Sequence, residues 1–243
     1  MDSTLEIKTQ ETYLEQFSKE GVVVFKKLLN ETSINFIKEE LSHIRAAVFE
    51  RIATMDRPLR TYSDIAEREL GRLDYRCGFK SPMFEEIAQP IIHLIKQMSP
   101  QIDLRHYWGA IPSLGKSRPT AWHRDVYPIL NNIEGQNLCE FDIDLPAYYF
   151  TVLIPLVNIT EENGPTRFIK GTHKQMQVNV DEKDAFAPLV TPGDVTIFDG
   201  RILHKGSANQ TDNERLVAYI TFVAHWYHDQ TFTINDYLFP ELA

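Results

Sequence analysis

The sequence predicts a mainly β fold in which amino-terminal helices flank a sandwich or barrel. Two observations lead to this prediction. Up to about residue 100, apolar residues recur every three or four positions, as they do on helices that bury one face. From about residue 101 onward, short apolar segments are separated by Gly, Pro, Asn and Asp, as in all-β domains. A chain of 243 residues has the length of one large domain, so we expect a single domain over residues 1–243.

The helical part is predicted from apolar spacing and capping residues. The expected elements are helices over residues 10–19, 34–52 and 84–98 and a strand over residues 22–25. The strand is assigned because Val22, Val23 and Val24 are consecutive β-branched residues. Asn30 or Thr32 is the expected N-cap of the long helix, because short polar side chains accept hydrogen bonds from its free N–H groups.

Short strands dominate the second part of the chain. The expected strands span residues 106–111, 121–127, 148–157, 166–169, 178–180, 195–198 and 216–225, with one more near Leu189. Residues 131–147 form a polar, acidic connection between two of them. We interpret a connection of this length as either a lid over a substrate or a solvated insertion.

The balance of charge bounds the classes of partner. The chain carries 34 Asp and Glu residues against 25 Lys and Arg, a formal net charge of −9. This excess disfavours nucleic acid and anionic membranes, since binding either needs a basic surface. Cys77 and Cys139 do not form a disulfide framework, and the amino terminus lacks the pattern of a signal peptide. We therefore expect a cytoplasmic protein. We also expect a monomer or homodimer.

Three residues form a candidate metal site. His123 and Asp125 are two positions apart in an expected strand, so their side chains point to the same face. One imidazole and one carboxylate are two thirds of the facial triad that binds non-haem Fe(II). His204 follows a turn, a short apolar strand and a second turn, and it supplies the third ligand. An H-x-D pair alone is common by chance, and the order of all three residues favours the metal site.

Arg215 is the candidate residue for an anionic ligand. It begins the expected strand that follows His204. A buried arginine without a partner is costly, and its planar fork binds a carboxylate through two hydrogen bonds. A dicarboxylate beside the metal therefore explains Arg215, and a structural salt bridge is the alternative.

The order of these motifs resembles the phytanoyl-CoA dioxygenase family of Fe(II)- and 2-oxoglutarate-dependent oxygenases. Residues 160–173, TEENGPTRFIKGTH, are similar to a recurrent segment of that family, and residues 192–204 resemble the strand that carries its third metal ligand. The resemblance covers nearly the whole chain. Lys170 stands where the family usually has proline, and Gly206 stands where it often has serine.

The resemblance implies a double-stranded β-helix (a jelly roll, cupin-like) over about residues 101–243, with a helical buttress over about residues 1–100. It implies Fe(II), 2-oxoglutarate and O2 as cofactor and cosubstrates. The implied metal ligands and catalytic residues are His123, Asp125 and His204, and the implied 2-oxoglutarate contacts are Arg215 and Thr166. Thr166 is alternatively a turn cap.

The activity implied is hydroxylation or another oxidation of a small-molecule substrate in specialised metabolism. Asp125 favours hydroxylation over halogenation, because in this superfamily a small residue at that position leaves a coordination site for halide. The alternatives are an acyl-CoA hydroxylase of the same family and a non-catalytic jelly-roll binding protein. The acidic chain shows no obvious basic site for the phosphates of CoA.

Two further groups of residues have less specific patterns. His225, His228 and Asp229 form a second candidate metal cluster, but His228 and Asp229 are neighbours and would diverge on a strand. We interpret this cluster as the end of the last strand. Arg72 and Arg76 lie where relatives place a segment over the active site, so they either contact an anionic substrate or cofactor or lie on the surface.

Overall fold

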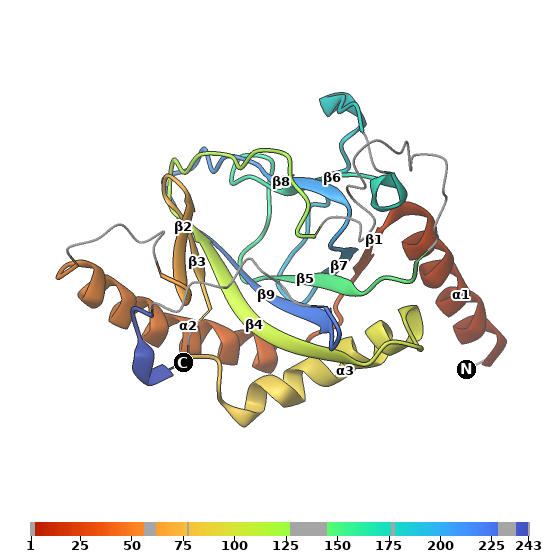
Figure 1. Cartoon of the computed structure of the whole chain (residues 1–243), viewed down its shortest axis with the longest axis horizontal. Coiled ribbons are helices and arrows are strands. Elements are labelled where there is room, and N and C mark those ends of the chain that lie inside the picture. Colours follow the sequence, from red (N-terminus) through yellow and green to blue (C-terminus); the bar gives the residue numbers. More distant parts are fainter. Residues whose placement is uncertain are drawn as a thin grey trace.

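The computed structural model describes residues 3–55, 62–76, 78–126, 145–175, 178–227 and 237–242. Figure 1 shows its helices and strands in chain order: α1 (Ser3–Glu20), β1 (Val22–Phe25), α2 (Glu31–Ile52), β2 (Ile65–Glu69), β3 (Arg72–Tyr75), α3 (Pro82–Met98), β4 (Leu104–Ser113), β5 (Tyr149–Pro155), β6 (Thr166–Ile169), β7 (Val195–Asp199), β8 (Leu203–Gly206) and β9 (Arg215–Ala224). None of the helices in these described ranges is long and apolar enough to cross a membrane.

Two antiparallel sheets form the β part of the molecule. The larger sheet has seven strands in the order β1-β7-β5-β9-β4-β3-β2, and the smaller one pairs β6 with β8. The small sheet lies on one side of the large sheet, and α2 and α3 lie on the other (Figure 1). The predicted mainly β fold with flanking helices and a jelly-roll core is therefore confirmed.

The alternation of side chains along a strand separates the core from a cavity between the sheets. On β9, the core with the helices includes Ala218, Ile220 and Phe222. The intervening residues of β9 line the cavity: Arg215, Val217, Tyr219 and Thr221. The same division holds on β5, where Phe150, Val152 and Ile154 are in the core and Tyr149, Thr151 and Leu153 line the cavity.

The helices are positioned by their caps and by one apolar face each. Asn30 is the N-cap of α2, because its side chain accepts a hydrogen bond from the Ser33 backbone N–H at 2.9 Å. Ser81 caps α3 in the same way, with Pro82 as the first helical residue. The buried residues of α2 repeat at helical spacing: Ile34, Ile37, Leu41, Ile44 and Val48.

Three predicted strands are absent from the described residues, and one hairpin was not predicted. Residues 121–127 do not form a strand over their described part, because only His123 pairs, in an isolated bridge with His204. Residues 178–180 and Leu189 lie outside strands too, and Val180 and Leu189 are exposed instead of buried against a sheet. The hairpin of β2 and β3 was missed, because its many charged residues hide the alternation.

Several residues singled out by the sequence lie outside the described ranges. They are Cys77, Cys139, His228, Asp229 and most of the 131–147 connection.

Candidate metal and cosubstrate site

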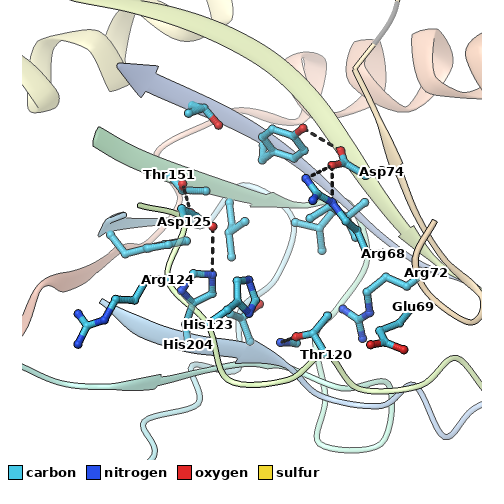
Figure 2. A pocket seen from close by; sticks show the side chains of 18 of the residues that line it. Arg68, Glu69, Arg72, Asp74, Thr120, His123, Arg124, Asp125, Thr151 and His204 are labelled. Carbon is cyan, nitrogen blue, oxygen red and sulfur yellow. Dashed lines mark hydrogen bonds and ion pairs between the residues drawn. The ribbon is translucent and has the colours of Figure 1, made fainter. Parts of the chain in front are cut away.

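His123, Asp125 and His204 come together as predicted. One potential donor atom from each residue lies within 4.8 Å of the other two. His123 and His204 exchange backbone hydrogen bonds, each 2.9 Å long, so the isolated bridge sets one imidazole directly beside the other. Asp125 is held by its backbone N–H, which donates to the Gly200 carbonyl at 2.9 Å. Figure 2 shows the three side chains clustered at one side of the cavity.

The two imidazoles are oriented by backbone carbonyls. The Nδ1 atom of His123 lies 2.9 Å from the Ala121 carbonyl oxygen, and that of His204 lies 3.0 Å from the Ile202 carbonyl oxygen. A carbonyl oxygen can only accept, so each Nδ1 carries the proton and each Nε2 lone pair is available to a metal. Burial lowers the pKa of His204, against the opposing effect of Asp125, and so favours the neutral form that binds metals.

Thr151 orients the carboxylate of Asp125. Its hydroxyl donates to Asp125 Oδ2 at 2.6 Å, while Asp125 Oδ1 lies 3.5 Å from His204 Nε2. The hydrogen bond occupies one carboxylate oxygen and leaves the other on the side of the histidines, as Figure 2 shows. Two imidazole nitrogens and one monodentate carboxylate oxygen are the donor set of a non-haem Fe(II) site, so the residues fit this metal.

Arg215 is buried in the same cavity, with 3% of its surface exposed. Its Nη2 donates to Ser113 Oγ at 2.7 Å, and its Nη1 donates to the Gly164 carbonyl. Its Nε has no partner among the described residues, and no carboxylate there forms an ion pair with it. Burial and then the nearby charge of Arg72 lower the pKa of Arg215 to about 9. Such a cation is strongly stabilised by any anion that enters.

The Asn163-Gly164 motif holds Arg215 in place. Asn163 Oδ1 accepts a hydrogen bond from the Thr160 N–H at 2.9 Å, and the Gly164 N–H donates to the Thr160 carbonyl at 3.1 Å. Gly164 has a φ of +88°, and a Cβ on it would come within 2.3 Å of the Ala208 carbonyl oxygen. Glycine is therefore required where the turn aims its carbonyl at the guanidinium.

Arg72 is a second buried cation in the cavity, with 4% of its surface exposed. Its Nη2 donates to the Ser207 carbonyl at 2.6 Å, and its Nε has no partner among the described residues. A Cβ on Gly206 would lie 2.2 Å from Arg72 Nη1. The absence of a side chain on Gly206 thus makes room for the Arg72 guanidinium. Of the two interpretations of Arg72, the surface position is wrong.

Asp74, on the missed hairpin, organises a second polar cluster in the cavity wall. Its Oδ2 accepts hydrogen bonds from Arg68 Nε at 2.9 Å and from Arg76 Nη2 at 2.7 Å, and its Oδ1 accepts from the Tyr219 hydroxyl at 2.8 Å. The two arginines keep the pKa of Asp74 below its usual value in spite of burial. Arg76 therefore binds the carboxylate of Asp74 and is not among the described residues that line the cavity.

Sequence reasoning found the metal triad and missed much of the surrounding cavity. Thr166 lines the cavity, in register with Gly206 across the small sheet, and its contact with 2-oxoglutarate stays a prediction. The residues missed are Arg68, Asp74, Ser113, Thr151 and Tyr219. The alternation on the two central strands identifies Thr151 and Tyr219 as facing away from the core. The resemblance alone pointed to the segment of Arg72 and Arg76, and no local pattern placed the hairpin at the cavity.

The relatives that align with most of the chain include two dioxygenases. Fe(II)/2-oxoglutarate-dependent dioxygenase nvfF from Aspergillus novofumigatus (strain IBT 16806) is 27% identical over 209 residues, which cover 81% of this chain and 65% of the relative. Dioxygenase FUM3 from Gibberella moniliformis (strain M3125 / FGSC 7600) is 24% identical over 226 residues, covering 86% of this chain and 70% of the relative. The chain thus spans about two thirds of the length of these relatives.

The fold is similar to that of solved structures with 2-oxoglutarate bound. HygX from Streptomyces hygroscopicus with nickel, 2-oxoglutarate and hygromycin B bound has a TM-score of 0.64 at 16% identity, over 89% of this chain and 88% of HygX. EctD from S. alaskensis with 2-oxoglutarate and 5-hydroxyectoine has a TM-score of 0.63 at 17% identity, over 92% of this chain and 76% of EctD. The family model of phytanoyl-CoA dioxygenase (PhyH) matches residues 17–217. The chain belongs to the phytanoyl-CoA dioxygenase family.

Proposed function

We propose that this protein is a non-haem Fe(II)- and 2-oxoglutarate-dependent oxygenase that oxidises a small molecule. The observation that carries the proposal is the meeting of two features in one cavity. The His123, Asp125 and His204 donors converge on one point, and Arg215 lies buried in the same cavity without a carboxylate partner among the described residues. A metal chelated by a dianion satisfies both features at once.

Each residue of the site has a defined task in this proposal. His123, Asp125 and His204 would hold the iron at one side of the cavity. Arg215 binds the distal carboxylate of 2-oxoglutarate, with the Ser113 hydroxyl beside its guanidinium. Thr166 contributes a hydroxyl to the same ligand, and Arg72 adds a second positive charge to that end of the cavity. When bound, iron, 2-oxoglutarate and O2 together supply the oxidising power for attack on a C–H bond.

The alternatives are less well supported. An acyl-CoA hydroxylase needs a basic surface for the CoA phosphates, and the excess of acidic residues in the chain disfavours one. A non-catalytic binding protein has no need for two imidazoles oriented with their Nε2 atoms toward a shared point. The names of the relatives support a dioxygenase. Hydroxylation of a small molecule in specialised metabolism is the reaction we expect.

Anaerobic titration of Fe(II) and then 2-oxoglutarate tests the proposal. A metal-to-ligand charge-transfer absorption should appear only when both are present. In air, the loaded protein should convert 2-oxoglutarate to succinate slowly even without its substrate, whereas a binding protein should not. Absence of both the absorption and succinate would refute the assignment.

The remaining sequence predictions concern the whole protein. One shared core joins α2 and α3 to the large sheet and supports a single domain over residues 1–243. We expect a monomer or homodimer in sedimentation measurements and a cytoplasmic location in cell fractionation. We also expect no affinity for nucleic acid, because the chain has an excess of acidic residues.

A further inference from the structure

The cavity has a second polar wall opposite the metal ligands. The cavity has a volume of about 370 Å³. Figure 2 shows Asp125 and His204 on one side of it and Arg68 and Asp74 across from them. Arg68 and Asp74 come from the β2–β3 hairpin, and neither is needed to hold iron or the distal carboxylate of 2-oxoglutarate. This wall therefore faces the space that remains for a substrate.

One side of the Arg68 guanidinium, that of Nη1, makes no hydrogen bond to the described residues. The Nε and Nη2 atoms of Arg68 both contact Asp74 Oδ2, at 2.9 and 2.7 Å. The side chain is 42% exposed and lines the cavity. Arg68 thus offers N–H donors to a ligand while Asp74 fixes the position of the guanidinium.

The charged groups of this wall interact with one another. Asp74 is one carboxylate shared by two guanidiniums, those of Arg68 and Arg76. Burial lowers the pKa of Arg72 to about 10, and nearby Glu69 opposes this shift. Arg68 therefore shares the carboxylate of Asp74 with a second guanidinium, which leaves Arg68 able to bind a further anion such as a carboxylate.

Tyr219 completes the wall and is itself fully engaged. It lies opposite Gly109 in the β4–β9 register, and a Cβ on Gly109 would come within 2.2 Å of the tyrosine ring. The glycine lets the ring lie close to the sheet and reach Asp74, to which the hydroxyl donates. Burial and Asp74 raise the pKa of Tyr219 well above its usual value, so the phenol stays neutral. In the group formed by Asp74, Arg68 and Tyr219, the N–H donors that remain available to a ligand are accordingly those of Arg68.

We propose that Arg68 binds a carboxylate of the substrate, so that the substrate is a small organic acid with an apolar body. The inference rests on the proposed function, because the iron and 2-oxoglutarate assignments define which part of the cavity is left for the substrate. The apolar body would contact the cavity residues Ile111, Tyr149 and Val217. The carboxylate would hold it at a defined distance from the metal ligands on the opposite wall.

Matched acids and amides test this inference. The probes are ω-phenylalkanoic acids of graded chain length and their primary amides. Each is titrated calorimetrically into the anaerobic protein loaded with Fe(II) and saturating 2-oxoglutarate, while the charge-transfer absorption is followed. A charge-assisted hydrogen bond predicts that at least one acid binds about tenfold to hundredfold more tightly than its amide. The absorption should persist throughout.

Variants assign the preference to Arg68. Arg68→Met should remove the preference for acid over amide, and Arg68→Lys should keep part of it. Arg76→Met is the matched control: it takes an equal charge away from Asp74, but Arg76 is not among the residues that line the cavity. Arg76→Met should reduce the preference less than Arg68→Met does, because the N–H donors of Arg68 remain in the cavity. Thermal unfolding of each variant verifies that it is folded.

Several outcomes would overturn the inference. These are equal binding of every acid and its amide by the unmodified protein, no binding of any probe, and loss of the preference in Arg76→Met as complete as in Arg68→Met. Disappearance of the absorption on adding an acid would place that acid in the 2-oxoglutarate site and also count against Arg68. If the absorption never forms, the proposed function fails first, so the two failures are distinguishable.

Discussion

The two faces of the seven-stranded sheet are built from the same strands but differ in their surroundings: one packs in an apolar core and the other lines a polar cavity. On the face toward the helices, Phe150, Val152 and Ile220 are almost completely buried in an apolar core. On the face toward the cavity, the neighbours of these residues include Thr151 and Tyr219, which make hydrogen bonds to Asp125 and Asp74. The contrast indicates that one face supplies stability and the other supplies chemistry, with one residue of strand between them.

The cavity face carries a cost that the helix face must offset. Arg72 and Arg215 are buried cations without an ion pair among the described residues, and such groups destabilise a folded protein. Apolar burial on the other face stabilises by about 25 cal/mol per Å². Substitutions on the two faces should therefore separate stability from ligand binding.

The largest effect is expected at the metal ligands. His123→Ala, Asp125→Ala and His204→Ala should each abolish stoichiometric Fe(II) binding and turnover, because each removes one of three donors. The fold should remain, since these residues lie on the cavity side. Iron analysis after anaerobic loading and circular dichroism measure the two properties. A variant that still binds one iron as tightly as the unmodified protein excludes that residue from the triad.

The next largest effect is expected on the helix face. Phe150→Ala should lower the free energy of unfolding by about 3–5 kcal/mol, because it leaves a cavity in a fully buried position. Urea denaturation measures this change. The folded fraction should still bind iron, since Phe150 faces away from the metal ligands. A change below about 1 kcal/mol would contradict the division between the faces.

Replacement of Arg215 should weaken ligand binding and leave stability intact, which is the opposite of the effect expected for Phe150. Arg215→Met should weaken 2-oxoglutarate binding by about tenfold to hundredfold, by loss of charge-assisted hydrogen bonds. The ligand-free variant should be at least as stable as the unmodified protein, because a buried unpaired charge is gone. Anaerobic titration of 2-oxoglutarate and urea denaturation test the two expectations. Arg215→Lys should restore only part of the affinity.

If Arg215→Met binds 2-oxoglutarate as tightly as the unmodified protein, another residue anchors the distal carboxylate. Iron binding is the internal control in this experiment, since the described contacts of Arg215 are to Ser113 and Gly164 and not to the metal ligands.

The smallest effect is expected at Thr151. Thr151→Val keeps the shape of the side chain but removes the hydrogen bond to Asp125 Oδ2, and it should weaken Fe(II) binding by about tenfold. Thr151→Ser keeps the hydroxyl and should behave like the unmodified protein. Competition with a metal chelator measures both affinities. Equal affinities in the valine and serine variants would mean that backbone geometry alone orients the carboxylate.

Local sequence patterns were sufficient for two of the helices, for the central strands and for the clustering of the candidate metal ligands. Helical spacing placed α2 and α3, and apolar runs placed β5, β7 and β9 to within a few residues. The order of His123, Asp125 and His204 predicted a cluster that the structure contains. The strand assigned to residues 121–127 was wrong, although the same-side arrangement of His123 and Asp125 was right. A single bridge was enough to orient them.

The sequence by itself determined which residue types can bind iron and a dicarboxylate, because donor chemistry belongs to the side chain. Only the tertiary structure decided what surrounds them. Ser113 reaches Arg215 from a strand 102 positions away, and Asp74 meets Tyr219 across 145 positions. Such contacts depend on strand order and register, which charged and irregular segments such as the β2–β3 hairpin do not reveal locally. The wall that faces the substrate was therefore set by how β3, β4 and β9 pair.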